Sequence, residues 1–126
     1  MNIWVLQTGE TLQIDATIYR PMRAINLSNA LVERGHKVIL WSADFDHFSK
    51  KHRFGSNKSI KYSDNLEIRL IKSRGYKSNS ARIARLIDHA QLGYNLKKML
   101  KYAGAPDVVF IGYPPIETAW VMTNWL

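Results

Sequence analysis

The chain has 126 residues, of which 46% are hydrophobic, and carries a formal net charge of +8. This length and composition predict one compact domain with its own core and exclude a disordered polar segment. The absence of cysteine excludes disulfide frameworks, thiolate metal sites and cysteine nucleophiles. No apolar run reaches the ~18 residues of a membrane-spanning helix, and no signal-peptide pattern opens the chain, so we expect a cytoplasmic protein.

Short apolar runs alternate along the chain with helical patterns. The first run, residues 3–6, predicts a buried strand. A helix is then predicted over residues 21–34, with Pro21 at its first position and Gly35 just past its end. His36 follows that glycine at the amino end of the next strand, so we interpret it as a structural residue rather than a catalytic one.

The middle of the chain predicts two further strands and a long connection. Residues 38–41 form a continuous apolar run, which is typical of a strand covered on both faces. Residues 43–65 are polar and basic, and they predict a loop with a minor strand near Ile60. Residues 66–71 alternate apolar and polar side chains, which indicates a third strand nearer an edge.

The last third of the chain predicts helix, strand and helix. The long helix covers about residues 80–102, a fourth strand covers 108–111, and a final helix begins at Ile116. The long helix carries an apolar stripe that starts at one set of positions and rotates to another, namely Ile83, Leu86, Ile87 and Ala90, then Leu92, Leu96, Met99 and Leu100.

Strands separated by helices predict an α/β fold, a Rossmann-like doubly wound parallel sheet with four main strands in the order 3-2-1-4. Ligands of such sheets bind beyond the carboxyl ends of strands 1 and 4. The loops at those ends supply the first candidate binding residues: Thr8, Gly9, Glu10, Gly112, Tyr113 and Pro114. Glu10 could bind a sugar hydroxyl, act as a base, or belong to an ordinary polar turn. The second loop could bind a ligand or only initiate a helix.

Further candidates are charged or aromatic residues expected near the same edge. Arg20, Arg23, Arg74 and Tyr76 could grip a diphosphate, because arginine presents paired donors to phosphate oxygens, although surface solubility also explains the arginines. Asp44 follows the second strand at the binding edge and is a further candidate. The remaining histidines, His47, His52 and His89, lack the spacing of a metal site, so no metal ligand is predicted.

Positive charge is concentrated in one part of the sequence. Nine Lys and Arg residues stand against two acids between Lys50 and Lys77. Such a segment could attract nucleic acid, a phosphate-bearing substrate or an anionic membrane, or it could be a solvated surface. The stretch from Lys50 to Phe54 mixes cations with an aromatic residue, as membrane-surface loops do, and a disordered loop is the alternative.

Two segments of the chain, RPMRAINLSNALVERGHKVILWSADF and PDVVFIGYPPIETAWVMTNWL, resemble the N-terminal domain of GT-B fold glycosyltransferases. The resemblance is to the family 4 type that acts on bacterial surface polysaccharides, and LSNALVERGHKVILWS is its most specific part. It implies sugar transfer from a nucleotide-sugar donor to a glycan or polyprenyl-diphosphate-linked acceptor, without a metal ion or other cofactor. In this family the N-terminal domain holds the acceptor and the C-terminal domain holds the donor.

The resemblance also implies what this chain lacks. The donor-binding Glu-x7-Glu motif of the family is absent. We therefore expect residues 1–126 to be a single acceptor-side domain, the front of a longer two-domain chain, with no catalytic residue and no transfer activity by itself. Its expected place is the cytoplasm, at the periphery of the inner membrane face, without a nucleic-acid partner. The alternative is a stand-alone basic α/β module that binds nucleic acid or phospholigands.

Overall fold

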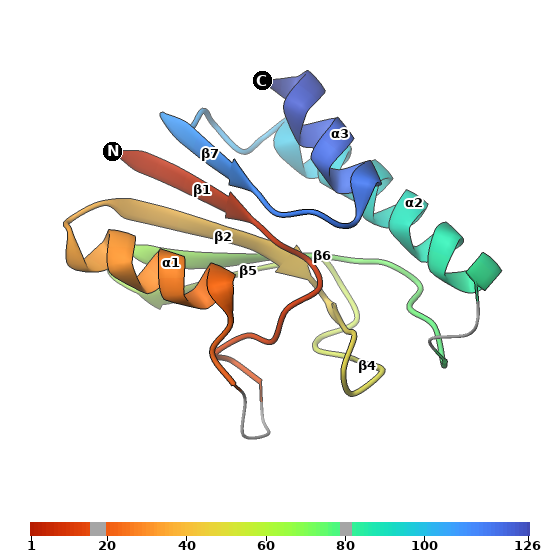
Figure 1. The fold of residues 1–126 in the computed structure, drawn as a ribbon. Helices are drawn as coiled ribbons and strands as arrows, with labels where there is room; N and C mark the ends of the chain where they lie inside the picture. The colour runs from red at the N-terminus through yellow and green to blue at the C-terminus, as the bar shows by residue number, and fades with distance from the viewer. Residues whose placement is uncertain (16–19, 79–81) are drawn as a thin grey trace.

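A five-stranded, mostly parallel sheet lies at the centre of the computed structural model, which describes residues 1–15, 20–78 and 82–126 (Figure 1). The sheet order is β5-β6-β2-β1-β7. Four of its strands are parallel: β1 (Asn2–Leu6), β2 (Lys37–Ala43), β6 (Leu66–Ile71) and β7 (Val108–Ile111). These four keep the mutual order third, second, first, fourth. The complete order differs from the expected one because an antiparallel strand, β5 (Lys58–Ser63), is added beside β6.

The segment over residues 43–65, expected to be a loop with a minor strand near Ile60, contains three strands, and the one around Ile60 is β5. β3 (Phe45–Asp46) and β4 (Lys51–His52) form a small antiparallel pair, and β5 extends the main sheet. β6 is therefore an interior strand, although its alternating pattern predicts a strand nearer an edge. The side chains of β5 are exposed except for the half-buried Ile60, so this edge strand has almost no hydrophobic signal in the sequence.

Helices cover both faces of the sheet (Figure 1). α1 (Arg23–Glu33) packs on one face, in a core that includes Val5, Leu40 and Ile68. α2 (Arg82–Leu100) and α3 (Ile116–Trp125) cover the other face, over a core that includes Trp4 and Trp41. Because neighbouring side chains of a strand point to opposite faces, this arrangement buries continuous apolar strands such as β1 and β2.

The end of α1 agrees with the sequence prediction and its start does not. The helix begins at Arg23 instead of Pro21. At its other end Gly35 adopts a positive φ of 87°, and its N–H donates to the carbonyl of Val32 at 2.9 Å. His36 lies at the amino end of β2, with its Nδ1 atom 3.3 Å from the terminal amine, far from the carboxyl edge of the sheet. The structural interpretation of His36 is thus supported.

The two predicted apolar stripes of α2 differ in burial. Leu92, Leu96 and Leu100 are buried against the sheet and α3, whereas Ile83 and Leu86 are exposed. The predicted start of this helix at Ser80 falls within residues 79–81, which lie outside the described part of the chain. Within the described ranges, no helix combines the length and hydropathy needed to cross a membrane.

A substitution at Gly75 tests how closely residues 72–78 pack against β3. Its φ is +73°, and an added Cβ would lie 2.5 Å from the Phe45 ring, whereas Gly55 has a similar φ of +80° and open space. We expect Gly55→Ala to cost about 1 kcal/mol of unfolding free energy from the left-handed backbone. Gly75→Ala should cost about 1–3 kcal/mol more, because the ring must move. Urea denaturation measures both, and equal losses would contradict this contact.

Candidate functional site

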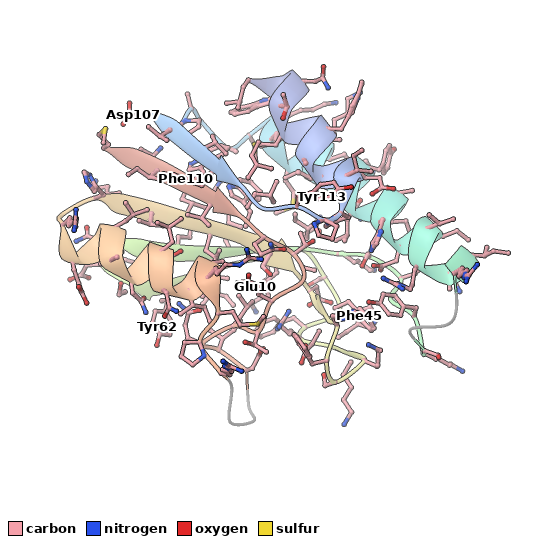
Figure 2. The ribbon with its side chains drawn as sticks, in the orientation of Figure 1. Glu10, Phe45, Tyr62, Asp107, Phe110 and Tyr113 are labelled. Atoms are coloured by element: carbon pink, nitrogen blue, oxygen red, sulfur yellow. The ribbon has the colours of Figure 1, made fainter. Side chains whose placement is uncertain are left out.

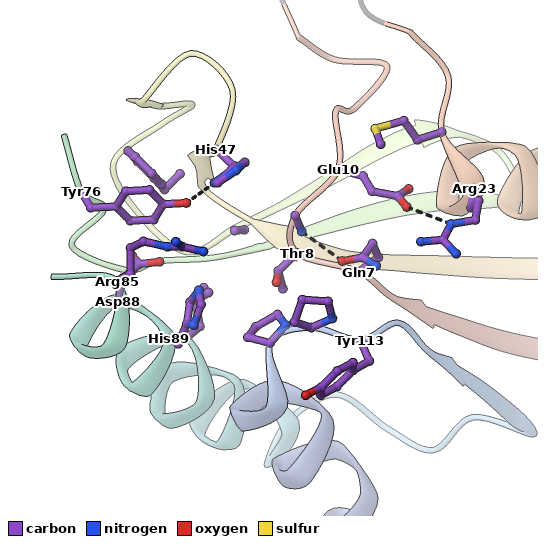
Figure 3. Close-up of a pocket in the computed structure, with 17 residues that line it drawn as sticks. Gln7, Thr8, Glu10, Arg23, His47, Tyr76, Arg85, Asp88, His89 and Tyr113 are labelled. Carbon is purple, nitrogen blue, oxygen red and sulfur yellow. Dashed lines mark hydrogen bonds and ion pairs between the residues drawn. The ribbon is translucent and has the colours of Figure 1, made fainter. Parts of the chain in front are cut away.

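A cleft of about 280 Å³ opens at the carboxyl edge of the sheet (Figure 3). It is lined by the segments that follow β1, β2 and β7, by the start of α1, by Tyr76 and by one face of α2. Figure 2 shows Glu10 beside the first turn of α1 and Tyr113 between β7 and α3. The cleft thus lies where the topology predicts a ligand site.

The structure brings seven of the predicted binding residues together around this cleft: Thr8, Gly9, Glu10, Arg23, Tyr76, Tyr113 and Pro114. Gly112 lines an adjoining hollow instead. Its own role is steric, because a Cβ at this position would lie 2.5 Å from Nε2 of Gln7. Arg20 and Arg74 are exposed and line neither space, so they are not brought to the cleft.

Asp44 was predicted at the binding edge, but the structure buries it and it does not line the cleft. Its side chain is completely buried, and its carboxylate accepts the backbone N–H groups of Phe54 and Gly55 at 2.7 and 3.0 Å. Nδ1 of His52 lies 3.1 Å from the same carboxylate. The position after a strand at the binding edge suggested a ligand contact, but a buried carboxylate must first be satisfied by nearby donors. Asp44 holds the loop that follows β4.

Glu10 organises the start of α1. Its Oε2 accepts the N–H of Ala24 at 2.9 Å, and its Oε1 lies 3.9 Å from Nε of Arg23. The N-cap residue Met22 makes no side-chain hydrogen bond to the helix. Glu10 therefore satisfies an otherwise open helix N–H from outside the helix, and its negative charge faces the positive end of the helix dipole.

Tyr76 is hydrogen-bonded to His47 on one wall of the cleft, and the guanidinium carbon of Arg85 lies 5.7 Å from the ring centre of Tyr76 (Figure 3). Burial raises the pKa of Tyr76 above its ordinary 10.0, although the nearby Arg85 opposes this, so the phenol is neutral and can donate. Burial and then the Lys50 and Arg85 cations lower the pKa of His47 below 6.5. With the Tyr76 hydroxyl as donor to Nδ1 of the neutral His47, the ring proton is on Nε2.

The α2 wall presents Arg85, Asp88, His89 and Leu92. Asp88 is buried, and its Oδ1 accepts the N–H of Gly75 at 2.8 Å, which holds the segment carrying Tyr76 against the helix. Nδ1 of His89 lies 4.0 Å from a carboxylate oxygen of Glu117 in α3. The cleft thus combines two guanidinium groups, two imidazoles, aromatic rings and two carboxylates that accept backbone N–H groups, which suits a polar ligand.

Arg85, Asp88, His89 and His47 line the cleft although none of them is among the predicted site residues. Arg85, Asp88 and His89 share a helix face at spacings of three and four residues, and this pattern of titratable groups beside the buried Leu92 was a usable signal. His47 had no such signal, because its partner Tyr76 lies 29 residues away. Among the described residues, no three His, Asp or Glu side chains cluster as ligands for a metal ion.

Comparisons of the chain with protein-family models, with curated proteins and with solved structures give no match.

Asp44→Ala should destabilise the fold by about 3 kcal/mol, since the backbone N–H groups of Phe54 and Gly55 and the His52 ring lose a charged acceptor. Asp64→Ala, at an exposed turn position, is the matched control and should leave the midpoint nearly unchanged. Urea denaturation measures stability, and hydrogen exchange of the Phe54 and Gly55 amides reports the loop directly. Unchanged protection of these amides in Asp44→Ala would contradict the role of Asp44.

Tyr76→Phe should raise the pKa of His47 part of the way back to 6.5, because the lost hydroxyl stabilises the neutral ring while burial remains. Since folding lowers this pKa, the neutral ring contributes stability above pH 6.5 that is lost as the pH falls through the folded value. Nitrogen-15 NMR of the ring measures the pKa. Tyr62→Phe, on exposed β5, is the control. An identical His47 pKa in the parent chain, in Tyr76→Phe and in Tyr62→Phe would refute the hydrogen bond.

Proposed function

We propose that this chain is the Rossmann-like acceptor-binding domain of a GT-B glycosyltransferase, family 4-like, that acts in cell-surface polysaccharide biosynthesis. The observation that carries the proposal is the position of the cleft. It lies at the carboxyl ends of β1, β2 and β7, between the first turn of α1 and one face of α2. In an open α/β sheet this is the place at which a substrate is held.

The chemistry of the cleft supports a glycan or diphosphate-bearing ligand. Arg85 offers a planar set of charged donors, and the Nε2–H of His47 offers a neutral one. Tyr113 at the cleft is 67% exposed, so its ring is free to stack on the apolar face of a sugar. Donors beside an exposed aromatic ring fit a sugar that carries a phosphate group better than a purely apolar ligand.

The remaining features of the proposal follow from the same activity. The nucleotide-sugar donor would be a co-substrate held by a C-terminal donor-binding domain, and neither a metal ion nor a further cofactor is proposed. The acceptor would be a glycan or a polyprenyl-diphosphate-linked intermediate at the cytoplasmic membrane face. Residues 1–126 alone would bind the acceptor without transferring a sugar, so robust transfer by this segment would overturn the assignment.

Titration with geranyl-diphosphate-linked N-acetylglucosamine, followed by NMR, tests acceptor binding directly. We expect saturable shifts at the amides of Gln7 and Tyr113. Arg85→Gln should weaken binding by about tenfold or more, since a charge-assisted hydrogen bond is lost. Arg20→Gln removes the same charge outside the cleft and should have little effect.

His47→Gln provides a second variant in case Arg85→Gln alters the packing around Tyr76. It should also weaken the acceptor analogue, while far-UV circular dichroism verifies that the fold is kept. If Arg20→Gln weakened binding of the analogue as much as Arg85→Gln does, the loss would come from net charge and not from a contact in the cleft. Tighter, steeply salt-dependent binding of single-stranded RNA with no response to the analogue would instead favour the basic nucleic-acid module.

A further inference from the structure

The outer face of α2 is the side of the helix that points away from the core and the cleft. Arg85, Asp88 and His89 point toward the cleft, and Leu92, Leu96 and Leu100 are buried. The outer face consists of the exposed positions Arg82, Ile83, Leu86, Ile87, Ala90, Gln91, Tyr94, Lys97 and Lys98, followed by Lys101. One helix thus presents two separate surfaces.

The first half of the outer face of α2 is apolar. Ile83, Leu86 and Ile87 are 75%, 62% and 39% exposed, and Tyr94 is 61% exposed further along the same line. Spacings of three, four and seven residues place these side chains side by side on one stripe. Exposing three clustered aliphatic side chains to water is energetically unfavourable, and such clusters on a surface mark an interaction site.

The second half of the outer face is basic. Lys97, Lys98 and Lys101 continue the stripe, and Nζ of Lys98 lies 4.5 Å from the ring centre of Tyr94. The one acid of α2, Asp88, is buried and faces the other way. No exposed acidic side chain of this helix therefore opposes an anionic partner.

We propose that the outer face of α2 docks on an anionic lipid bilayer. The aliphatic side chains would enter the boundary between headgroups and acyl chains, and the lysines would contact lipid phosphates. This inference goes beyond the proposed function, because it does not depend on which ligand the cleft takes.

The charge and apolar pattern of this face favours a bilayer over other partners. A nucleic acid would pair with the lysines but offers no apolar phase for Ile83 and Leu86, since single strands are bound by stacking on aromatic rings. A second copy would bring a like set of lysines against this one and be repelled. A bilayer satisfies both halves of the face at once.

α2 is also a better candidate for the membrane contact than the loop from Lys50 to Phe54. Arg53 in that loop is almost fully buried, with its Nε 2.6 Å from Asp15 and its Nη2 3.7 Å from Asp46. Part of the positive charge of this loop is thus paired with carboxylates inside the protein and does not face solvent. The loop still exposes the Phe54 ring, so the experiment compares the two regions.

Co-sedimentation with vesicles tests the apolar half. The chain should bind vesicles of equimolar phosphatidylcholine and phosphatidylglycerol and bind phosphatidylcholine alone far less. The triple variant Ile83→Gln, Leu86→Gln, Ile87→Gln should bind at least about tenfold more weakly, because buried apolar area is lost. The control Ile116→Gln, Trp120→Gln removes similarly exposed apolar side chains from α3 and should retain binding.

The basic half is tested with lysine pairs. Lys97→Gln, Lys98→Gln should weaken binding by about fivefold for each lysine. Lys58→Gln, Lys61→Gln removes the same charge from β5 and should have a much smaller effect. If both double variants lost vesicle binding equally, net charge alone would explain the binding. If the β5 variant lost more, the membrane contact would lie at β5. Either result overturns the proposal.

Because the chain has no cysteine, a single introduced thiol reports the depth of insertion without depending on the polar variants. Leu86→Cys labelled with a polarity-sensitive fluorophore should shift to the blue on anionic vesicles, and labelled Ile116→Cys should not. No shift at position 86 overturns the proposal. Loss of self-association or of RNA binding in the Ile83, Leu86, Ile87 variant, without vesicle binding by the parent chain, would assign the face to a second copy or to nucleic acid instead.

Discussion

β1 forms parallel hydrogen-bonded ladders with β2 on one side and with β7 on the other. Parallel pairing forces the chain to return to the starting edge before each next parallel strand, through α1 after β1, through the antiparallel β5 after β2 and through α2 after β6. The four parallel strands therefore all end at the same edge. The loops after β1, β2 and β7 therefore meet at the cleft. Both the double layer of helices and the position of the candidate site depend on this one pairing pattern.

Buried polar groups hold the loops at that edge in place. Asp44 binds the amides after β4, Glu10 binds the first turn of α1, and Asp88 binds Gly75 beside Tyr76. Each carboxylate is buried and satisfied by donors from a different segment. The lining of the cleft is consequently built on a rigid frame, and the groups left to meet a ligand are mainly cationic, imidazole and aromatic.

The extent of successful prediction follows the range of the interactions. The apolar runs of β1, β2 and β7 and the glycine that ends α1 are local signals, and each predicted element is present. The sequence predicts only a minor strand where β5 lies, because the exposed side chains of β5 carry no apolar pattern. β5 is stabilised by its hydrogen-bonded pairing with β6. Topology located five of the cleft residues in the loops after β1 and β7, and side-chain type added Arg23 and Tyr76. Topology did not predict the burial of Asp44, which depends on the loop folded over it.

The sequence by itself determined the α/β class, the mutual order of the parallel strands and the edge at which the cleft opens, because periodicity and crossover handedness need only local information. Only the tertiary structure decided which side chains face the cleft and which stripe of α2 faces outward. His47 meets Tyr76 across 29 residues, and Ile83 is exposed while Leu92 is buried on the same helix. Such contacts depend on how distant segments pack, and no single segment encodes them.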